Sequence, residues 1–164
     1  MLISVPYNRE QALAYANKWA LHYNPRYYNF AKIGGDCTNF ASQILYAGCG
    51  VMNHDPYGWY YANVNRRSAS WCSVEYLYKF LINNRGCGPM GEEVDLRDIQ
   101  CGDLVQLSLK GQRFEHCPVV VGVQGPRSLA SIFVASHTRD VYYEPLSNYK
   151  WADIRFVHIT GAKK

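Results

Sequence analysis

The stretch Ile33–Gly48, with the sequence IGGDCTNFASQILYAG, constrains the fold more than any other part of the chain. Apolar and small residues recur in it at the spacing of one helical face: Cys37, Phe40, Ala41, Ile44, Leu45 and Gly48. This spacing predicts an amphipathic helix that begins at Cys37. Asp36 is the predicted N-cap, and Gly48 and Gly50 predict the end of the helix.

Cys37 falls in the first turn of this helix, where the positive end of the helix dipole favours a thiolate. A thiolate is a nucleophile, so this is a position at which a cysteine enzyme can hold its reactive sulfur. A cysteine on an apolar helix face is more often a buried structural residue. The Gly34-Gly35-Asp36 lead-in distinguishes Cys37 from the other cysteines of the chain.

Composition indicates one globular domain over residues 1–164, because 48% of the residues are hydrophobic and 18% are charged. The net charge of +4 is small and scattered, which argues against a nucleic-acid partner. The chain has no C-x-x-C or H-x₃₋₅-H spacing, so we expect neither a metal site nor a cofactor. The sequence does not indicate an oligomeric state.

The six cysteines are expected to be reduced, because a domain of this size does not need disulfides. The first six residues lack the charged start and apolar run of a signal peptide, and no stretch is long enough to span a membrane. We therefore expect a cytoplasmic protein as the chain is given, or a secreted or cell-wall protein if a leader has been removed.

Helical patterns come first and strands second, which favours an α+β domain with an antiparallel sheet. A capping-box pattern at Asn8 starts a helix that ends before Asn24-Pro25, and another helical stripe runs from Val74 to Leu81. The expected strands are Leu104–Leu109, Pro118–Gln124, Ser131–His137, Tyr142–Pro145 and Ile154–Ile159. Residues 86–91 are expected to form a loop.

Residues 49–71 have no regular period and are expected to form a long surface excursion, a kind of segment that often has a functional role. Four aromatic residues at or near its end are candidates for a substrate groove: Trp59, Tyr60, Tyr61 and Trp71. The alternative is that these rings pack the excursion onto the body of the protein.

A nucleophilic cysteine needs a base, and His116 and His137 are the candidates for a base and its orienter. The chain between them resembles a hairpin that turns near Gly125-Pro126, and a symmetric pairing places the two histidines opposite each other on one face. The alternative is that each histidine is hydrogen-bonded locally and has no catalytic role.

The segment GGDCTNFASQ resembles the motif of the bacterial "putative amidase" domain family, which is usually placed with papain-like cysteine peptidases and amidases of the NlpC and CHAP types. The resemblance extends from Tyr7 to Ile159. The matching pieces, in order, are YNREQALAYANKWA, NPRYYNF, GGDCTNFASQ, VMNHDPYGWYY, CGDLVQL, FEHCPVVVGV, VASHTRD and IRFVHI.

This resemblance implies a papain-like fold of the NlpC or CHAP type and a hydrolase that cleaves amide or peptide bonds. It assigns Cys37 as nucleophile, His116 as base and His137 as orienter, with Asp140 as the alternative orienter. Pro118 departs from the family pattern, because proline lacks the N–H that a central strand uses. The implied substrate is a cell-wall peptide or a related amide; the rival function is a non-catalytic module that binds glycan or peptide.

Transition-state stabilisation in such an enzyme needs two N–H donors for the oxyanion. The backbone N–H of Cys37 is one candidate, because first-turn N–H groups of a helix are unpaired. The second donor is left open among Tyr27, Tyr28 and Asn39.

Overall fold

The structure is a computed structural model that describes residues 1–164. In chain order its elements are β1 (Ser4–Val5), α1 (Arg9–Trp19), α2 (Cys37–Cys49), β2 (Tyr61–Asn63), β3 (Arg66–Arg67), α3 (Ala69–Cys72), α4 (Val74–Asn83), β4 (Gly88–Val94), β5 (Leu104–Ser108), β6 (Val119–Val123), β7 (Ile132–Ser136), β8 (Val141–Pro145) and β9 (Asp153–Lys163). The main strands β4 to β9 follow the helices, as expected, whereas the short strands β1 to β3 lie before or between them.

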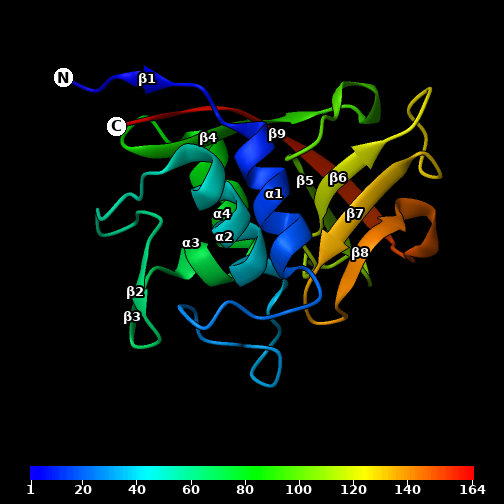
Figure 1. Ribbon diagram of the computed structural model, residues 1–164, viewed down its shortest axis with the longest axis horizontal. Coiled ribbons are helices and arrows are strands. Elements are labelled where there is room, and N and C mark those ends of the chain that lie inside the picture. Colours follow the sequence, from blue (N-terminus) through cyan, green and yellow to red (C-terminus); the bar gives the residue numbers. More distant parts are fainter.

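One antiparallel sheet forms the body of the protein, in the strand order β1-β9-β5-β6-β7-β8, with β4 paired to β9. Its strands β5 to β8 curl to one side of the helices, while the long strand β9 runs behind α1 and α2 (Figure 1). The two chain ends meet, because Ile3 and Lys164 exchange two backbone hydrogen bonds of 2.8 and 3.0 Å. None of the helices combines the length and hydropathy needed to cross a bilayer.

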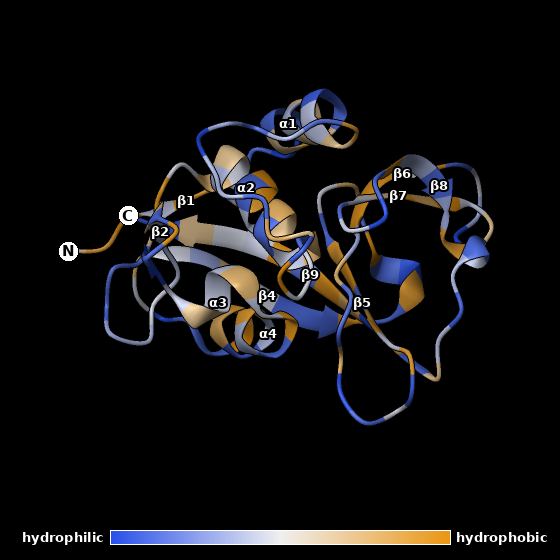
Figure 2. Cartoon of the chain, turned by 90° about the horizontal axis from the view of Figure 1, so that it is seen from below, coloured by the Kyte–Doolittle hydropathy of each residue, from blue (hydrophilic) through white to orange (hydrophobic).

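The sheet separates two hydrophobic cores. The larger core packs α1, α2 and α4 against the sheet and contains the predicted apolar face of α2, including Phe40, Ile44 and Leu45. The smaller core lies on the other side of the strands and contains Val105 and Val134. Apolar residues accordingly gather on α2 and along β6 and β7 (Figure 2). The alternation along each strand therefore decides which core a side chain enters.

The predicted helix start at Asn8 is confirmed, since its side chain accepts a hydrogen bond from the N–H of Gln11 at 3.0 Å. The predicted end of α2 is only partly right. Gly50 ends the helix with a left-handed φ of 68°, whereas Gly48 lies inside it. A Cβ atom on Gly48 would lie 2.1 Å from the Tyr7 ring, so this glycine serves close packing.

Two regions differ from the sequence prediction. Residues 88–94 form strand β4 instead of a loop, because β9 is long enough to pair with β4 on one edge and with β5 on the other. The 49–71 excursion contains the short hairpin β2–β3 and the first turn of α3. The sequence of β4, GPMGEEV, gives little local signal for a strand.

Candidate active site

Cys37 is the first residue of α2, at a point where two glycines turn the chain into the helix. Gly34 and Gly35 have φ angles of 87° and 104°, which residues with a side chain rarely adopt. A Cβ atom on Gly35 would lie 3.1 Å from Oγ1 of Thr138. The double glycine therefore lets the loop before α2 pack closely against the loop after β7.

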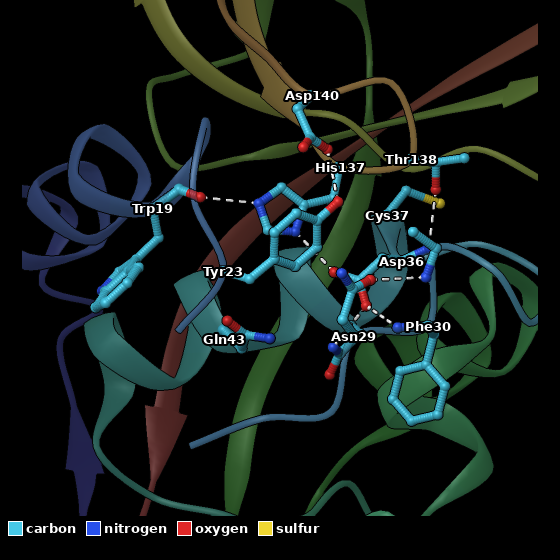
Figure 3. A network of polar contacts seen from close by, with 12 residues as sticks. Trp19, Tyr23, Asn29, Phe30, Asp36, Cys37, Gln43, His137, Thr138 and Asp140 are labelled. Carbon is cyan, nitrogen blue, oxygen red and sulfur yellow. Dashed lines mark hydrogen bonds and ion pairs between the residues drawn. The ribbon is translucent and has the colours of Figure 1, made fainter. Parts of the chain in front are cut away.

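Asp36 anchors this junction and is the N-cap residue of α2, as predicted, but its carboxylate does not accept the expected hydrogen bond from a backbone N–H of the first turn. Oδ1 instead accepts hydrogen bonds from the N–H of Phe30 at 2.8 Å and the side-chain amide of Asn39 at 2.9 Å. Oδ2 faces His137, and the backbone N–H of Asp36 donates to Thr138 Oγ1 at 2.8 Å (Figure 3). The carboxylate is thus fully occupied by tertiary contacts.

The Cys37 thiol is buried, with only 7% of the residue exposed. Its sulfur donates to the carbonyl of Glu115 at 3.9 Å and lies 3.8 Å from Oγ1 of Thr38. Burial raises the pKa of this thiol, although a hydrogen bond from the backbone of Cys117 to the sulfur acts in the opposite direction. Burial, the largest influence on this pKa, therefore opposes the thiolate that the helix end was expected to favour.

His116 lies just before β6, where its backbone pairs with Leu107 of β5. The ring lies 5.6 Å from the ring of Tyr149, and Nε2 is 3.5 Å from Oγ of Ser136. Burial, with a smaller contribution from the Arg139 charge, lowers the pKa of His116 to about 4. The imidazole is therefore uncharged at neutral pH.

No hydrogen bond joins the Cys37 thiol to the His116 ring, so the expected contact between them is not present in this structure. The backbone on both sides of His116 nevertheless contacts the sulfur, through the carbonyl of Glu115 and the N–H of Cys117. The His116 side chain itself lies on the other face of the strand, because His116 is paired with Leu107 of the smaller core, whereas Cys37 belongs to the larger core.

His137 does not lie on the same face as His116. Val119 of β6 pairs with Ala135 of β7, and continuing this register places Cys117, not His116, opposite His137. The ring of His137 stacks on Phe40 of α2 at a centroid distance of 3.8 Å, on the helix side of the sheet. The predicted contact between His137 and His116 is therefore wrong.

Both ring nitrogens of His137 have other partners. Nδ1 lies 2.7 Å from Oδ2 of Asp36, and Nε2 lies 2.8 Å from the carbonyl oxygen of Trp19 at the end of α1 (Figure 3). A carbonyl oxygen only accepts, so the ring donates to Trp19 through Nε2. The Asp36–His137 pair ties together α1, α2 and the loop after β7.

Asp140, the alternative orienter, does not contact His116 either. It is exposed, and its Oδ1 accepts a hydrogen bond from the Tyr23 hydroxyl at 2.8 Å. The polar neighbour of the His116 ring is Ser136, whose hydroxyl also donates to the carbonyl of His137 at 3.1 Å.

Asn39 is not free to act as the second oxyanion donor. Its Nδ2 donates to Asp36 Oδ1 and to the carbonyl of Tyr28, both at 2.9 Å, and its Oδ1 accepts from Trp71 Nε1 at 2.8 Å. The N–H of Tyr28 donates to the Tyr61 hydroxyl at 2.8 Å. The backbone N–H of Tyr27, the third proposed donor, donates to the carbonyl of Asn24 at 3.1 Å. All three proposed donors are therefore used within or beside the loop before α2.

The predicted aromatic groove is wrong, because its members fill the core. Trp59 and Trp71 have no exposed surface and Tyr61 is 8% exposed, while Tyr60 is half-buried. The ring of Tyr27 stacks on Trp71, with centroids 6.0 Å apart. The structure agrees with the alternative interpretation: these rings pack residues 49–71 onto the body of the protein.

An open pocket of about 800 Å³ lies instead between the 53–58 turn, the start of α3, and α4. Buried Asn53 and Asn84 form part of its floor, and Tyr57, Tyr76 and Lys79 stand exposed around it. Neither Cys37 nor His116 lines this pocket.

Sequence reasoning missed two residues beside His116. Ser136 is adjacent to a predicted site residue, but the observed register places Pro118 opposite it, so strand pairing alone did not point to its contact with His116. No pattern in the sequence pointed to Tyr149 as a neighbour of His116. Its hydroxyl is buried without a hydrogen-bond partner, and burial raises its pKa to about 12. No group of three His, Cys, Asp or Glu side chains is arranged to hold a metal ion.

Cys37 thus starts helix α2, and His116 lies just before strand β6. The family model described as "Putative amidase domain" matches residues 6–160. The chain belongs to this amidase family. Membership in the amidase family indicates hydrolysis of amide bonds as the class of reaction.

The amidase domain is also similar to a protein of Bacillus subtilis (strain 168) described as "Uncharacterized protein YhbB". The two are 33% identical over 120 residues, which is 70% of this chain and 37% of the relative. The chain thus aligns with little more than a third of the relative's length. No solved structure matches the chain.

Proposed function

We propose that this amidase domain is a cysteine-dependent amide hydrolase in which Cys37 is the nucleophile and His116 the base. One observation supports this proposal above all others: the two neighbours of His116 in sequence are the residues whose backbone contacts the Cys37 sulfur. A thiol at a helix start and an imidazole on the segment that covers it are the parts that acyl transfer requires.

The resting pair is uncharged, because burial raises the pKa of the thiol and lowers that of the imidazole to about 4. Catalysis then proceeds by general-base transfer, with no preformed thiolate–imidazolium pair. The segment that carries His116 rearranges so that the ring moves from the Ser136 face to Cys37, and the ring takes the thiol proton as sulfur attacks the amide carbonyl. His116 gives this proton to the leaving amine, and it later activates the water that releases the acyl group.

The oxyanion formed in each step is stabilised by the backbone N–H of Cys37, in the first turn of α2. The substrate we propose is a peptide or peptidoglycan-like amide. This follows from the resemblance to the NlpC and CHAP types of papain-like enzymes, and a mild positive charge is compatible with an anionic polymer.

The test is amine release from purified bacterial sacculi and from a panel of peptidyl coumarylamides. We expect wild-type turnover to fall at least about 100-fold in Cys37→Ala and in His116→Ala. Cys49→Ala, at the other end of the same helix, is the matched control and should keep full activity. Full activity in Cys37→Ala would refute the proposed mechanism.

A second candidate function, a non-catalytic module that binds glycan or peptide, is favoured by the missing Cys37–His116 contact and by the pocket on the α4 face. Such a module binds sacculi without releasing amine. Binding would then be lost in Tyr57→Ala and Lys79→Ala, and would be unaffected by Cys37→Ala.

A further inference from the structure

Phe114 begins the short segment Phe114–Cys117 that carries His116 and covers the Cys37 sulfur. Its backbone N–H donates to Oε1 of Glu75, in the first turn of α4, at 2.8 Å. Its ring lies under the guanidinium of Arg155, 3.9 Å from carbon Cζ. Two side chains from distant parts of the chain thus hold one end of the segment.

Arg155 of β9 is the centre of this arrangement, with a side chain only 11% exposed. The guanidinium is sandwiched, because it also lies 3.6 Å from the centroid of the Tyr78 ring. Its Nε donates to Oε1 of Gln106 at 2.8 Å, and Nη2 lies 3.5 Å from Oε2 of Glu75. Only a planar, forked cation can stack on two rings and serve two acceptors at its edge.

Gln106 of β5 extends the arrangement to the other end of the segment. It is fully buried, and its Nε2 donates to Sγ of Cys117 at 3.6 Å and to the carbonyl of Val74 at 3.4 Å. Arg155 fixes the opposite atom of the same amide and therefore sets which way it points. One arginine thus acts on Phe114 directly and on Cys117 through Gln106, on the two sides of His116.

We infer that Arg155 is a positioning residue, which holds the segment Phe114–Cys117 against the Cys37 thiol. The carbonyl of Glu115 and the N–H of Cys117, which contact the sulfur, belong to this segment. Loosening it admits water to the thiol, and removes the desolvation that keeps the thiol protonated. It also displaces the base. For turnover the inference rests on the proposed function; for the thiol environment it does not.

The first measurement is therefore the rate of Cys37 alkylation by iodoacetamide between pH 6 and 10, mapped by peptide mass spectrometry. In Arg155→Met we expect Cys37 to react about tenfold faster at pH 7.5 and its pH midpoint to fall. Cys49 of the same molecule is the internal reference, because global unfolding accelerates both thiols while the inference predicts a change at Cys37 alone.

Arg67→Met is the matched control. Arg67 is also partly buried and stacks on a phenylalanine, with Cζ 4.5 Å from the Phe30 ring, but it lies far from this segment in the chain. Its loss should leave the pH profile of Cys37 unchanged. Arg155→Lys keeps the positive charge but lacks the forked guanidinium. It should therefore be more stable than Arg155→Met, while the pH profile of Cys37 alkylation stays altered.

If Arg155→Met does not fold, Phe114→Leu tests the same inference, because it removes the stacked ring and leaves the Arg155–Gln106 bond in place. A Cys37 profile identical to wild type in the folded variants overturns the inference. If the wild-type protein turns over sacculi or coumarylamides, the folded variant should have a kcat at least about tenfold lower than wild type, with a KM within about twofold of the wild-type value. If Cys37→Ala keeps full turnover, the proposed function fails, and the alkylation profile still decides the positioning role.

Discussion

Nδ1 of His137 lies 2.7 Å from Oδ2 of Asp36, the residue just before the proposed nucleophile Cys37. Neither side chain is more than 1% exposed. Because Nε2 of the same ring is held by the Trp19 carbonyl, the ring cannot turn towards His116. His137 therefore acts on the site by fixing the backbone that leads into α2.

Breaking this pair should destabilise the fold strongly. In Asp36→Asn the ring loses its carboxylate partner in a buried setting, and we expect a loss of about 3–5 kcal/mol in the free energy of unfolding, measured with urea. Asp140→Asn, which changes an exposed carboxylate, should cost at most about 0.5 kcal/mol. Equal effects of the two substitutions would show that the Asp36–His137 pair contributes nothing to stability.

His116 should make the protein sensitive to acid. Burial lowers its pKa from 6.5 to about 4 in the folded state. Between these values the unfolded chain binds a proton that the native state does not, so the contribution is complete above pH 6.5 and is lost as the pH falls towards 4. Urea unfolding at several pH values should show a stability loss of at most about 3 kcal/mol that His116→Gln removes. If the free energy of unfolding depends on pH in the same way in wild type and in His116→Gln, the conclusion that burial lowers the pKa of His116 is contradicted.

Cys37 should be a slow thiol in the resting protein. Burial raises its pKa, so at pH 7 iodoacetamide should modify it more slowly than the partly exposed Cys87, and its rate should keep rising with pH beyond the ordinary value of 9.0. Peptide mapping after timed labelling measures both rates in one sample. The same protein in urea provides the control, because unfolding removes the difference in burial. If Cys37 were instead the fastest thiol to be labelled, the result would support a thiolate favoured by the start of α2.

Tyr149 should tolerate loss of its hydroxyl. That oxygen is buried without a partner, so Tyr149→Phe removes a desolvation penalty and should leave the free energy of unfolding unchanged or higher. Tyr7→Phe is the contrasting variant, because the Tyr7 hydroxyl donates to the carbonyl of Gly102 at 3.1 Å. It should cost about 1 kcal/mol by the same denaturation measurement. A larger loss in Tyr149→Phe would mean that its hydroxyl has a bound partner.

Local patterns in the sequence determined helices α1, α2 and α4 and most strands, but not the short helix α3. The 3.6-residue spacing of Phe40, Ile44 and Leu45 and the cap at Asn8 predicted α2 and α1, because each depends on residues within a few positions of one another. The alternating and β-branched runs predicted β5 to β9 for the same reason. Strand β4 was missed, since its hydrogen bonds depend on β9, about 70 residues later.

The composition of the candidate site was also present in the sequence, as Cys37 and His116, but its geometry was not. The pairing of β6 with β7 shifts between Val120 and Gly122, and this irregularity sets which residue faces Ser136. A change of one residue in register moves a side chain to the opposite face of the sheet. The His137 side chain therefore faces α2, and the His116 side chain faces Ser136. Burial, which depends on the whole packed structure, then reversed the direction of the Cys37 pKa that the helix end alone predicts.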